Sequence, residues 1–379
     1  MLRILFIFIL FVSPLKSQWV IMSNEADSLV LRGSKLIYNC QFDSAELIFD
    51  EVIEKYPDHP VGYFLDAMVD WWRIKIHRNE AVYAQSFENK IEIVVDKCDD
   101  LLDENPKDLT ALFFKGGALG YRGRYFAESK QWLSAATDGK EAFDIMLDCH
   151  EKAPGNHDIM LGSGIYNFYA AAIPEKYPLT KPLLAFLPEG NKKIGLLQLR
   201  SSAYHARYTT VEAKVMLLLS FYSFEKDYNS ALFWAKELHE EFPDNAYFHR
   251  YYARSKTRMG KWEELEQEWR NIIKKCIKRV EGYNNLTARE GLYYVGLALQ
   301  RKREYETALK YYNKCLEVGD YIDEEDSGYY LSAQFKIALI YDKTGKRDLA
   351  IKQYKKCLES EDYDGIHAKC KRYLEKAYR

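Results

Sequence analysis

The sequence predicts an all-α protein, a curved solenoid built from antiparallel helix pairs. The first observation is a recurring spacing of small residues followed by a proline, seen best from Ala26 to Pro57. The second is its recurrence at a register of 34 residues, as between Glu212 and Ala246. The third is the length of the array, because a single repeat cannot bury its apolar face and stacking must supply the core. Such a stack offers a long surface and argues against one deep catalytic pocket.

Helix packing explains the residues of each predicted repeat. Gly33 and Ala45 occupy the eighth and twentieth positions of the first repeat, where small side chains let two helices approach closely. Phe49 fills the space towards the next repeat, and Pro57 ends the second helix because proline disfavours helical geometry in the residue before it. The eighth and twentieth positions recur downstream as Leu219 and Ala231, Ala253 and Leu265, Gly296 and Ala308, and Ala338 and Ala350.

The predicted elements can be placed in order along the chain. After a leader over residues 1–17, a single solenoid covers 18–378, with repeats near 26–59, 60–107, 108–156, 157–208, 212–245, 246–284, 289–322 and 331–362, and a closing helix at 365–378. The closing helix is polar, as the open end of a stack requires. The repeat at 157–208 is irregular, because it contains Pro174, Pro178, Pro182 and Pro188. We interpret the proline-rich part, residues 175–188, as a long linker between the two helices of this repeat, packed on the solenoid surface.

The spacing of Gly33, Ala45, Phe49 and Pro57 resembles the tetratricopeptide repeat, a helix-turn-helix unit. This resemblance implies a right-handed superhelix that acts as a non-catalytic scaffold or adaptor and binds another protein or peptide in its concave groove. It also implies that positions two, five, nine, twelve and thirteen of each repeat line the groove.

A second resemblance is confined to the middle of the chain. The order Gly164, Pro174, Gly190, Gly195-Leu196 and Leu199 is similar to that in the tetratricopeptide-like proteins that clear inclusions at the mitochondrial outer membrane. The matching residues are glycine, proline and leucine, which serve packing, so no function is carried over from this resemblance.

Basic and aromatic residues occupy the expected groove positions of the later repeats. Arg250, Arg254 and Arg258 follow at i, i+4 and i+8, on one helix face, where they repel each other unless anions are nearby. The planar guanidinium suits carboxylates and phosphates. The following repeats add Tyr293, Arg301, Phe335 and Lys343. We expect this groove to bind a protein or peptide, with an acidic segment favoured. The alternative is a solvated face whose arginines pair with carboxylates such as Glu290.

The N-terminal repeats suggest a different groove, lined mainly by the apolar residues Phe64, Met68, Trp71, Phe113 and Tyr121. An exported protein could hold a small hydrophobic or glycan-like molecule there, beneath residues 175–188. The other interpretation is that these side chains are simply buried under that segment. The identity of the partner and the oligomeric state are left open by the sequence.

Composition and motifs argue against several other functions. The net charge of -2 gives no electrostatic case for nucleic acid or for an acidic membrane surface. The sequence has no P-loop, dinucleotide-binding turn or HExxH motif, and Gly162-Ser163-Gly164 lacks the spacing of a nucleophile elbow. Cys149-His150 and His157-Asp158 do not form the two tight ligand pairs of a zinc site. We expect no catalytic residue, metal or cofactor.

The seven cysteines are odd in number and have no CxxC spacing, so they do not indicate a disulfide framework or a zinc site. Most are expected to be core thiols. Cys357 and Cys370 could meet across an antiparallel helix pair, which the sequence alone cannot establish.

The first residues have the pattern of an export signal. Arg3 precedes an apolar run over residues 4–12, and Pro14 and Ser17 lead to a cleavage site before Gln18. The run is too short to span a bilayer, which needs about 20 residues. We expect export to the periplasm or cell surface of a bacterium. The alternative is an uncut leader that attaches the protein peripherally to a membrane.

Overall fold

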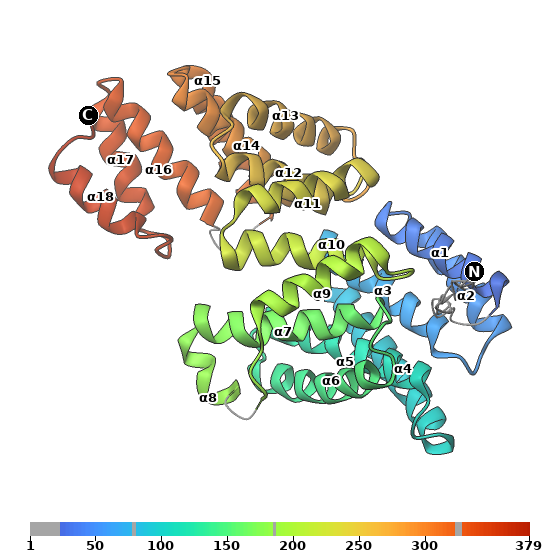
Figure 1. The fold of residues 1–379 in the computed structure, drawn as a ribbon. Helices are drawn as coiled ribbons and strands as arrows, with labels where there is room; N and C mark the ends of the chain where they lie inside the picture. The colour runs from blue at the N-terminus through green and yellow to red at the C-terminus, as the bar shows by residue number, and fades with distance from the viewer. Residues whose placement is uncertain (1–22, 78–80, 185–186, 323–327) are drawn as a thin grey trace, which may run out of the picture.

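The computed structural model describes residues 23–77, 81–184, 187–322 and 328–379 (Figure 1). The regular elements in these ranges are helices, and no β-strand occurs among them, so the predicted all-α class is confirmed. None of the helices in the described ranges is long and apolar enough to cross a membrane. The predicted leader, residues 1–17, lies outside the described residues.

The helices follow one another as pairs. The N-terminal pairs are α1 (Asn24–Tyr38) with α2 (Phe42–Lys55), α3 (Pro60–Ile76) with α4 (Ala81–Glu104), and α5 (Leu109–Glu128) with α6 (Trp132–Lys152). The middle pairs are α7 (Ile159–Lys176) with α9 (Lys192–His205), and α10 (Thr210–Leu219), extended by the π-helix Ser220–Glu225, with α11 (Tyr228–Glu241). The C-terminal pairs are α12 (Ala246–Arg258) with α13 (Trp262–Ile277), α14 (Asn285–Arg301) with α15 (Tyr305–Ile322), and α16 (Gly328–Lys343) with α17 (Arg347–Cys357), followed by α18 (Ile366–Glu375).

The turn inside most pairs has the same backbone geometry. One residue takes a positive φ, and the next amide donates to a carbonyl five residues earlier, as from Gln41 N to Leu36 O and from Lys346 N to Tyr341 O. This is the Schellman arrangement that ends a helix. The residues with positive φ in these turns are Cys40, Lys130, Gly260, Arg303 and Gly345. Lys226, which follows the π-helix, also has a positive φ. A lysine or cysteine in this conformation does not mark the turn in the sequence, since glycine is the usual residue there.

Glycines let α7 and α9 pack backbone to backbone. A Cβ added at Gly195 would lie 2.5 Å from the Phe168 nitrogen and 2.8 Å from the Gly164 oxygen. Gly190 approaches the Asn167 carbonyl in the same way. The order of glycines noted in this segment is therefore explained by close helix packing.

The first proline of the irregular repeat at 157–208, Pro174, does not end the helix in which it lies. Helix α7 continues through Pro174 to Lys176, and the 3₁₀ turn Pro178–Thr180 and α8 (Lys181–Leu184) follow. Both short elements contact α7, and Leu179 is almost fully exposed. This segment therefore packs on α7 rather than covering the N-terminal repeats.

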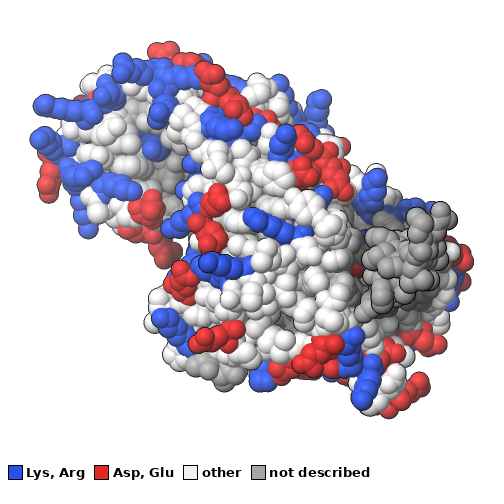
Figure 2. All heavy atoms as spheres, in the orientation of Figure 1, with Lys and Arg blue, Asp and Glu red and all other residues white. Residues whose placement is uncertain are grey.

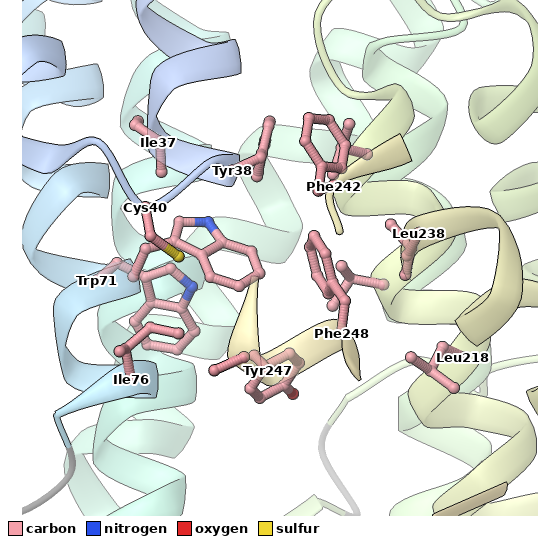
Figure 3. Packing of buried hydrophobic residues seen from close by; sticks show 14 of the residues in the cluster. Ile37, Tyr38, Cys40, Trp71, Ile76, Leu218, Leu238, Phe242, Tyr247 and Phe248 are labelled. Atoms are coloured by element: carbon pink, nitrogen blue, oxygen red, sulfur yellow. The ribbon is translucent and has the colours of Figure 1, made fainter. Parts of the chain in front are cut away.

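The first two helix pairs pack against the middle of the solenoid. Asn245 Nδ2 donates to the Tyr38 carbonyl, and Asn284 Nδ2 donates to the Ile76 carbonyl, each at 2.9 Å. Figure 3 shows Tyr38 facing Phe242 and Phe248 across this contact. The ring of Trp72 lies 5.3 Å from that of Phe248. The array therefore curls until its first repeats meet α10 and α12, and the main core lies between them.

A smaller apolar cluster lies at the C-terminal end of the stack. It joins α16, α17 and α18 through Leu331, Phe335, Tyr354, Cys357 and Cys370, among others. Here α18 covers the last repeat, in the position where a further repeat would otherwise stack.

Candidate functional site

A pocket of about 250 Å³ lies among the C-terminal repeats. It is formed by α13, α14, α15, α16 and the chain after α18. Its lining residues are Trp262, Leu297, Gln300, Arg301, Tyr305, Lys336, Leu339, Lys343 and Tyr378. Three of these carry positive charge and none is a carboxylate. On the face drawn in Figure 2, Lys and Arg side chains are also frequent over the C-terminal helices. We call this site the basic pocket.

The three cations of the basic pocket make no ion pair with any carboxylate in the described ranges. Arg301 and Lys343 are exposed, and the Arg301 guanidinium lies over the Trp262 ring at 4.5 Å. Lys336 is half-buried. Burial lowers the pKa of Lys336, and the nearby charge of Lys369 lowers it further. Lys336 is therefore only partly solvated, and none of the three cations has a compensating carboxylate in the described ranges.

The acidic residue next to Lys343 in the sequence is bound elsewhere. Asp342 accepts hydrogen bonds from Arg347 Nη1 at 2.9 Å and from the Tyr354 hydroxyl at 3.0 Å. It also accepts from the Tyr378 backbone nitrogen at 2.9 Å, which fixes the chain after α18 against the pocket. Asp342 therefore does not pair with Lys343.

The groove positions implied by the repeat resemblance agree with the pocket in part. Leu297, Gln300 and Arg301 are the ninth, twelfth and thirteenth residues of the repeat from 289, and Leu339 and Lys343 are the ninth and thirteenth of the next. The structure brings Arg301 and Lys343 together. Sequence reasoning missed Lys336, at position six. Its spacing from Leu339 and Lys343, at i+3 and i+7, places all three on one face of α16 and could have indicated it.

Two of the predicted groove arginines are instead part of the packing. Arg250 is 5% exposed and pairs with Glu290 at 3.1 Å, while Arg254 Nη2 donates to the same carboxylate at 2.6 Å. Burial would raise the pKa of Glu290, but the charges of Arg254 and Arg250 hold it at about 2. Arg250 and Arg254 therefore pair with Glu290, as the alternative interpretation held, but they do so inside the packing and not on a solvated face, because Glu290 of α14 lies against both guanidiniums of α12. They lock the two helices together.

The other predicted groove residues lie in different surroundings. Arg258 is exposed, with Nε 3.5 Å from the Tyr222 hydroxyl, and partner binding by it stays a prediction. Tyr293 packs in a tyrosine cluster with Tyr312 and Tyr329. Phe335 is buried against Tyr354 and Tyr373, so it does not face a groove. Helix α18 brings Tyr373 onto Phe335, which explains why position five fails in this last repeat.

The apolar groove expected in the N-terminal repeats is filled. Trp71 is 1% exposed, and Met68 is also buried. The Trp71 ring packs against Phe87 and Tyr121. Phe64 packs on Phe114 and Tyr121, and Phe113 packs on Phe114. Trp71 and Met68 therefore belong to the core, while Phe64, Phe113 and Tyr121 are partly buried beside it. The groove is filled by these side chains and by their neighbours in the N-terminal repeats, and not by residues 175–188, whose short helical elements contact α7.

A buried carboxylate joins the N-terminal repeats to the middle of the stack. Glu212, on α10, accepts hydrogen bonds from Trp72 Nε1 at 3.0 Å and from the Tyr38 hydroxyl at 3.3 Å. Burial raises the pKa of Glu212, and hydrogen bonds from Tyr121, Trp72 and Tyr38 oppose this shift. Glu212 was seen in the sequence only as the start of a repeat, because Tyr38 and Trp72 lie more than a hundred residues away from it.

One cluster in the described ranges has metal-ligand side chains. His239, His249 and Glu268 bring ligand atoms within 4.8 Å of one another. However, the two imidazoles are stacked with centroids 4.2 Å apart, so their ring nitrogens lie in nearly parallel planes and do not converge on one ion. Lys256 Nζ already donates to Glu268 at 3.1 Å. Burial lowers the pKa of His239 to about 4, which keeps this ring neutral. We interpret the cluster as a polar part of the packing.

The residues considered for zinc near the Pro-Gly turn are also held by the fold. Asp158 accepts from the backbone nitrogens of Tyr208 and Thr209, at 2.8 and 3.0 Å. His157 Nδ1 lies 3.0 Å from the Ser201 hydroxyl. These contacts fix the connection between α9 and α10.

Comparison with known proteins agrees with the repeat prediction. Residues 287–360, which span α14 to α17, match the family model of the tetratricopeptide repeat, so this chain carries tetratricopeptide repeats and the prediction is confirmed. No curated protein matches the chain.

Solved structures give only distant similarities. A tetratricopeptide repeat protein from Parabacteroides merdae is 14% identical, with 78% of this chain and 94% of that one covered and a TM-score of 0.33. The P58(IPK) TPR domain is 14% identical over 93% and 89%, with a TM-score of 0.26. NprR in complex with its cognate peptide NprX is 13% identical over 94% and 86%, with a TM-score of 0.34. At these scores the similarities support no inference about binding.

Proposed function

We propose that this chain is a non-catalytic interaction protein that binds an acidic segment of another protein, with the basic pocket as its docking point. One observation carries the proposal: Arg301, Lys336 and Lys343 line one pocket that contains no carboxylate. Tetratricopeptide arrays offer extended surfaces of the kind that peptide recognition uses, and clusters of basic residues recognise acidic motifs.

The physical argument rests on the cost of the unpaired charge. A half-buried ammonium such as Lys336 has lost part of its hydration, and its lowered pKa reflects that loss. A bound carboxylate would restore the lost interaction and favour the charged form. Arg301 adds a planar fork suited to two carboxylate oxygens. The small volume of the pocket fits a terminal carboxylate or one or two acidic side chains, with the rest of the segment outside.

The test is binding of a labelled glutamate-rich peptide with a free carboxyl terminus, measured by fluorescence anisotropy. A lysine-rich peptide of the same length should not bind. The double variant Arg301→Glu/Lys343→Glu should weaken binding by roughly tenfold or more, because hydrogen bonds to charged groups contribute about 1.5 to 3 kcal/mol. A peptide with an amidated terminus distinguishes recognition of the terminal carboxylate from recognition of side chains.

The matched control is Lys310→Glu/Lys352→Glu, which makes the same change in charge at exposed sites on α15 and α17, outside the pocket. Its binding should stay close to wild type. Equal weakening in the two double variants would mean that overall charge attracts the peptide and that the basic pocket is not the docking point. Failure of the wild-type chain to bind the glutamate-rich peptide would contradict the acidic partner.

The alternative function, an exported protein that holds a small hydrophobic or glycan-like molecule, has less support. Its expected groove is filled by Trp71, Met68 and their neighbours. Export itself remains our proposal on the pattern of residues 1–17. Mass spectrometry of native material should find a mature chain that begins at or near Gln18, and a chain that keeps residues 1–17 would contradict export with cleavage.

A further inference from the structure

Two thiols face each other at the C-terminal end of the molecule. Cys357 is the last residue of α17, and Cys370 lies in the middle of α18. Both side chains are fully buried, and they hydrogen-bond to each other. The sequence had left this pairing open, and the antiparallel packing of α17 and α18 brings it about.

The surroundings hold the two sulfurs in place. They belong to the apolar cluster of the last repeat, together with Ile366, Tyr354 and Leu331. The chain around α18 is also tied down by Arg347 Nη2, which donates to the Leu374 carbonyl at 2.8 Å. The main helix contacts of α18 are with α16 and α17, however, so opening of this end exposes the thiols without unfolding the rest.

The two thiols differ in acidity. The hydrogen bond from the Cys357 thiol lowers the pKa of Cys370. The same hydrogen bond, together with burial, raises the pKa of Cys357. Cys370 is therefore the sulfur that ionises first, and the thiolate is the nucleophile in disulfide chemistry.

We propose that Cys357 and Cys370 are a modification site, at which an intramolecular disulfide forms under oxidising conditions and joins α18 covalently to the last repeat. The co-reactant is a small disulfide such as oxidised glutathione. The Cys370 thiolate attacks one sulfur of that disulfide and releases a thiolate, which leaves a mixed disulfide on Cys370. The Cys357 sulfur, once deprotonated, attacks the Cys370 sulfur and releases the second small thiol. Two protein thiols are oxidised and one small disulfide is reduced to two thiols.

The test uses the full chain, reduced, separated from reductant and then incubated with oxidised glutathione. We expect an intact mass lower by two hydrogens and a higher melting temperature than that of the reduced chain. Trypsin cuts after Lys356, Lys369 and Lys371, so Cys357 and Cys370 fall on separate peptides. A non-reducing digest should contain these peptides joined, and reduction should separate them.

Variants test the assigned roles. Cys357→Ser should accumulate a glutathione adduct on Cys370, whereas Cys370→Ser should react slowly at Cys357. Cys276→Ser is the control, because Cys276 is the least buried of the cysteines and a reaction governed by exposure alone would occur there. The proposal is overturned if the oxidised wild-type chain yields no joined peptide, or if Cys276 reacts while Cys357 and Cys370 remain free thiols. The digest of the wild-type chain decides this even where a variant fails to fold.

Discussion

Two buried glutamates, Glu290 and Glu212, are stabilised by different means. Glu290 lies between two guanidiniums, which hold its pKa at about 2. Glu212 receives hydrogen bonds from the neutral groups of Tyr38 and Trp72, and burial raises its pKa. At Glu290 the two guanidiniums outweigh burial, whereas at Glu212 burial outweighs the hydrogen bonds and the charge of Arg124, so the two residues give opposite dependences of stability on pH.

Replacement of Glu290 by glutamine should destabilise the protein, because Arg250 and Arg254 would lose the buried carboxylate that they share. Loss of one side of a buried ion pair costs about 3 to 5 kcal/mol. The pKa of Glu290 is lowered on folding, so its contribution is present above the unfolded value of about 4.3 and is lost as the pH falls towards 2. Urea denaturation of wild type and Glu290→Gln at several pH values measures both effects. The exposed Glu54→Gln should change little, and an equal loss in both variants would contradict the role of Glu290.

Replacement of Glu212 by glutamine, unlike that of Glu290, should not destabilise the protein. The amide oxygen of Gln can still accept from Trp72 and Tyr38, and the buried charge is gone. Because the pKa of Glu212 is raised on folding, its ionised form costs stability above that pKa, and this cost disappears as the pH falls. We expect Glu212→Gln to be as stable as wild type or more stable at neutral pH in urea denaturation. A loss as large as that in Glu290→Gln would show that the negative charge itself is needed.

At the scale of helices, local signals were sufficient to predict the elements but not their contacts. Gly33, Ala45 and Pro57 mark close packing and a helix end within a few turns of themselves, so the sequence reveals them. The pairing of Arg250 with Glu290, 40 residues away on another helix pair, could be named from the sequence only as an alternative, because superhelical packing decides whether the two side chains meet. In the same way, the groove rule predicted Arg301 and Lys343 but failed at Phe335, because it assumes a further repeat where α18 packs.

Close packing of α7 on α9 can be tested with a single methyl group. In Gly195→Ala, the new Cβ would collide with the backbone of α7 at Phe168, and backbone cannot move aside as a side chain can. We expect a loss of about 1 to 3 kcal/mol in the free energy of unfolding. Gly139→Ala on α6 is the matched control, because a Cβ there meets nothing within 4 Å. It should stabilise the helix by about 0.5 to 1 kcal/mol. If Gly195→Ala and Gly139→Ala change the free energy of unfolding equally in thermal denaturation, α7 and α9 lie further apart than described.

At the scale of the molecule, the repeats do not form a simple linear array. In an ideal solenoid each repeat contacts only its neighbours, and stability is a sum of local terms. Here Asn284 is hydrogen-bonded to Ile76, and Asn245 to Tyr38, across more than two hundred residues. The N-terminal and middle repeats therefore share one core, whereas α16 to α18 also form a cluster of their own.

This difference predicts which helices lose stability when a core side chain is removed. Trp72 packs on Tyr247 and Phe248 of α12 and donates to Glu212 of α10. Trp72→Ala therefore removes contacts between the N-terminal repeats and the middle repeats. Large-to-small changes of this kind cost about 3 to 5 kcal/mol. Hydrogen exchange should then show faster exchange in α10 and α12 as well as in α3, while α16 to α18 keep their protection.

The control for this experiment is Tyr354→Ala, which removes a large side chain from the C-terminal cluster. Its effect should be confined mainly to α16, α17 and α18, because those helices end the stack. If Trp72→Ala speeds exchange only in α1 to α5, the contact between the N-terminal and middle repeats contributes little to stability and the chain unfolds as a linear array. If Trp72→Ala instead speeds exchange in α12 and leaves the protection of α17 unchanged, the contact between the N-terminal and middle repeats decides which helices unfold together. Proximity along the chain then does not decide it.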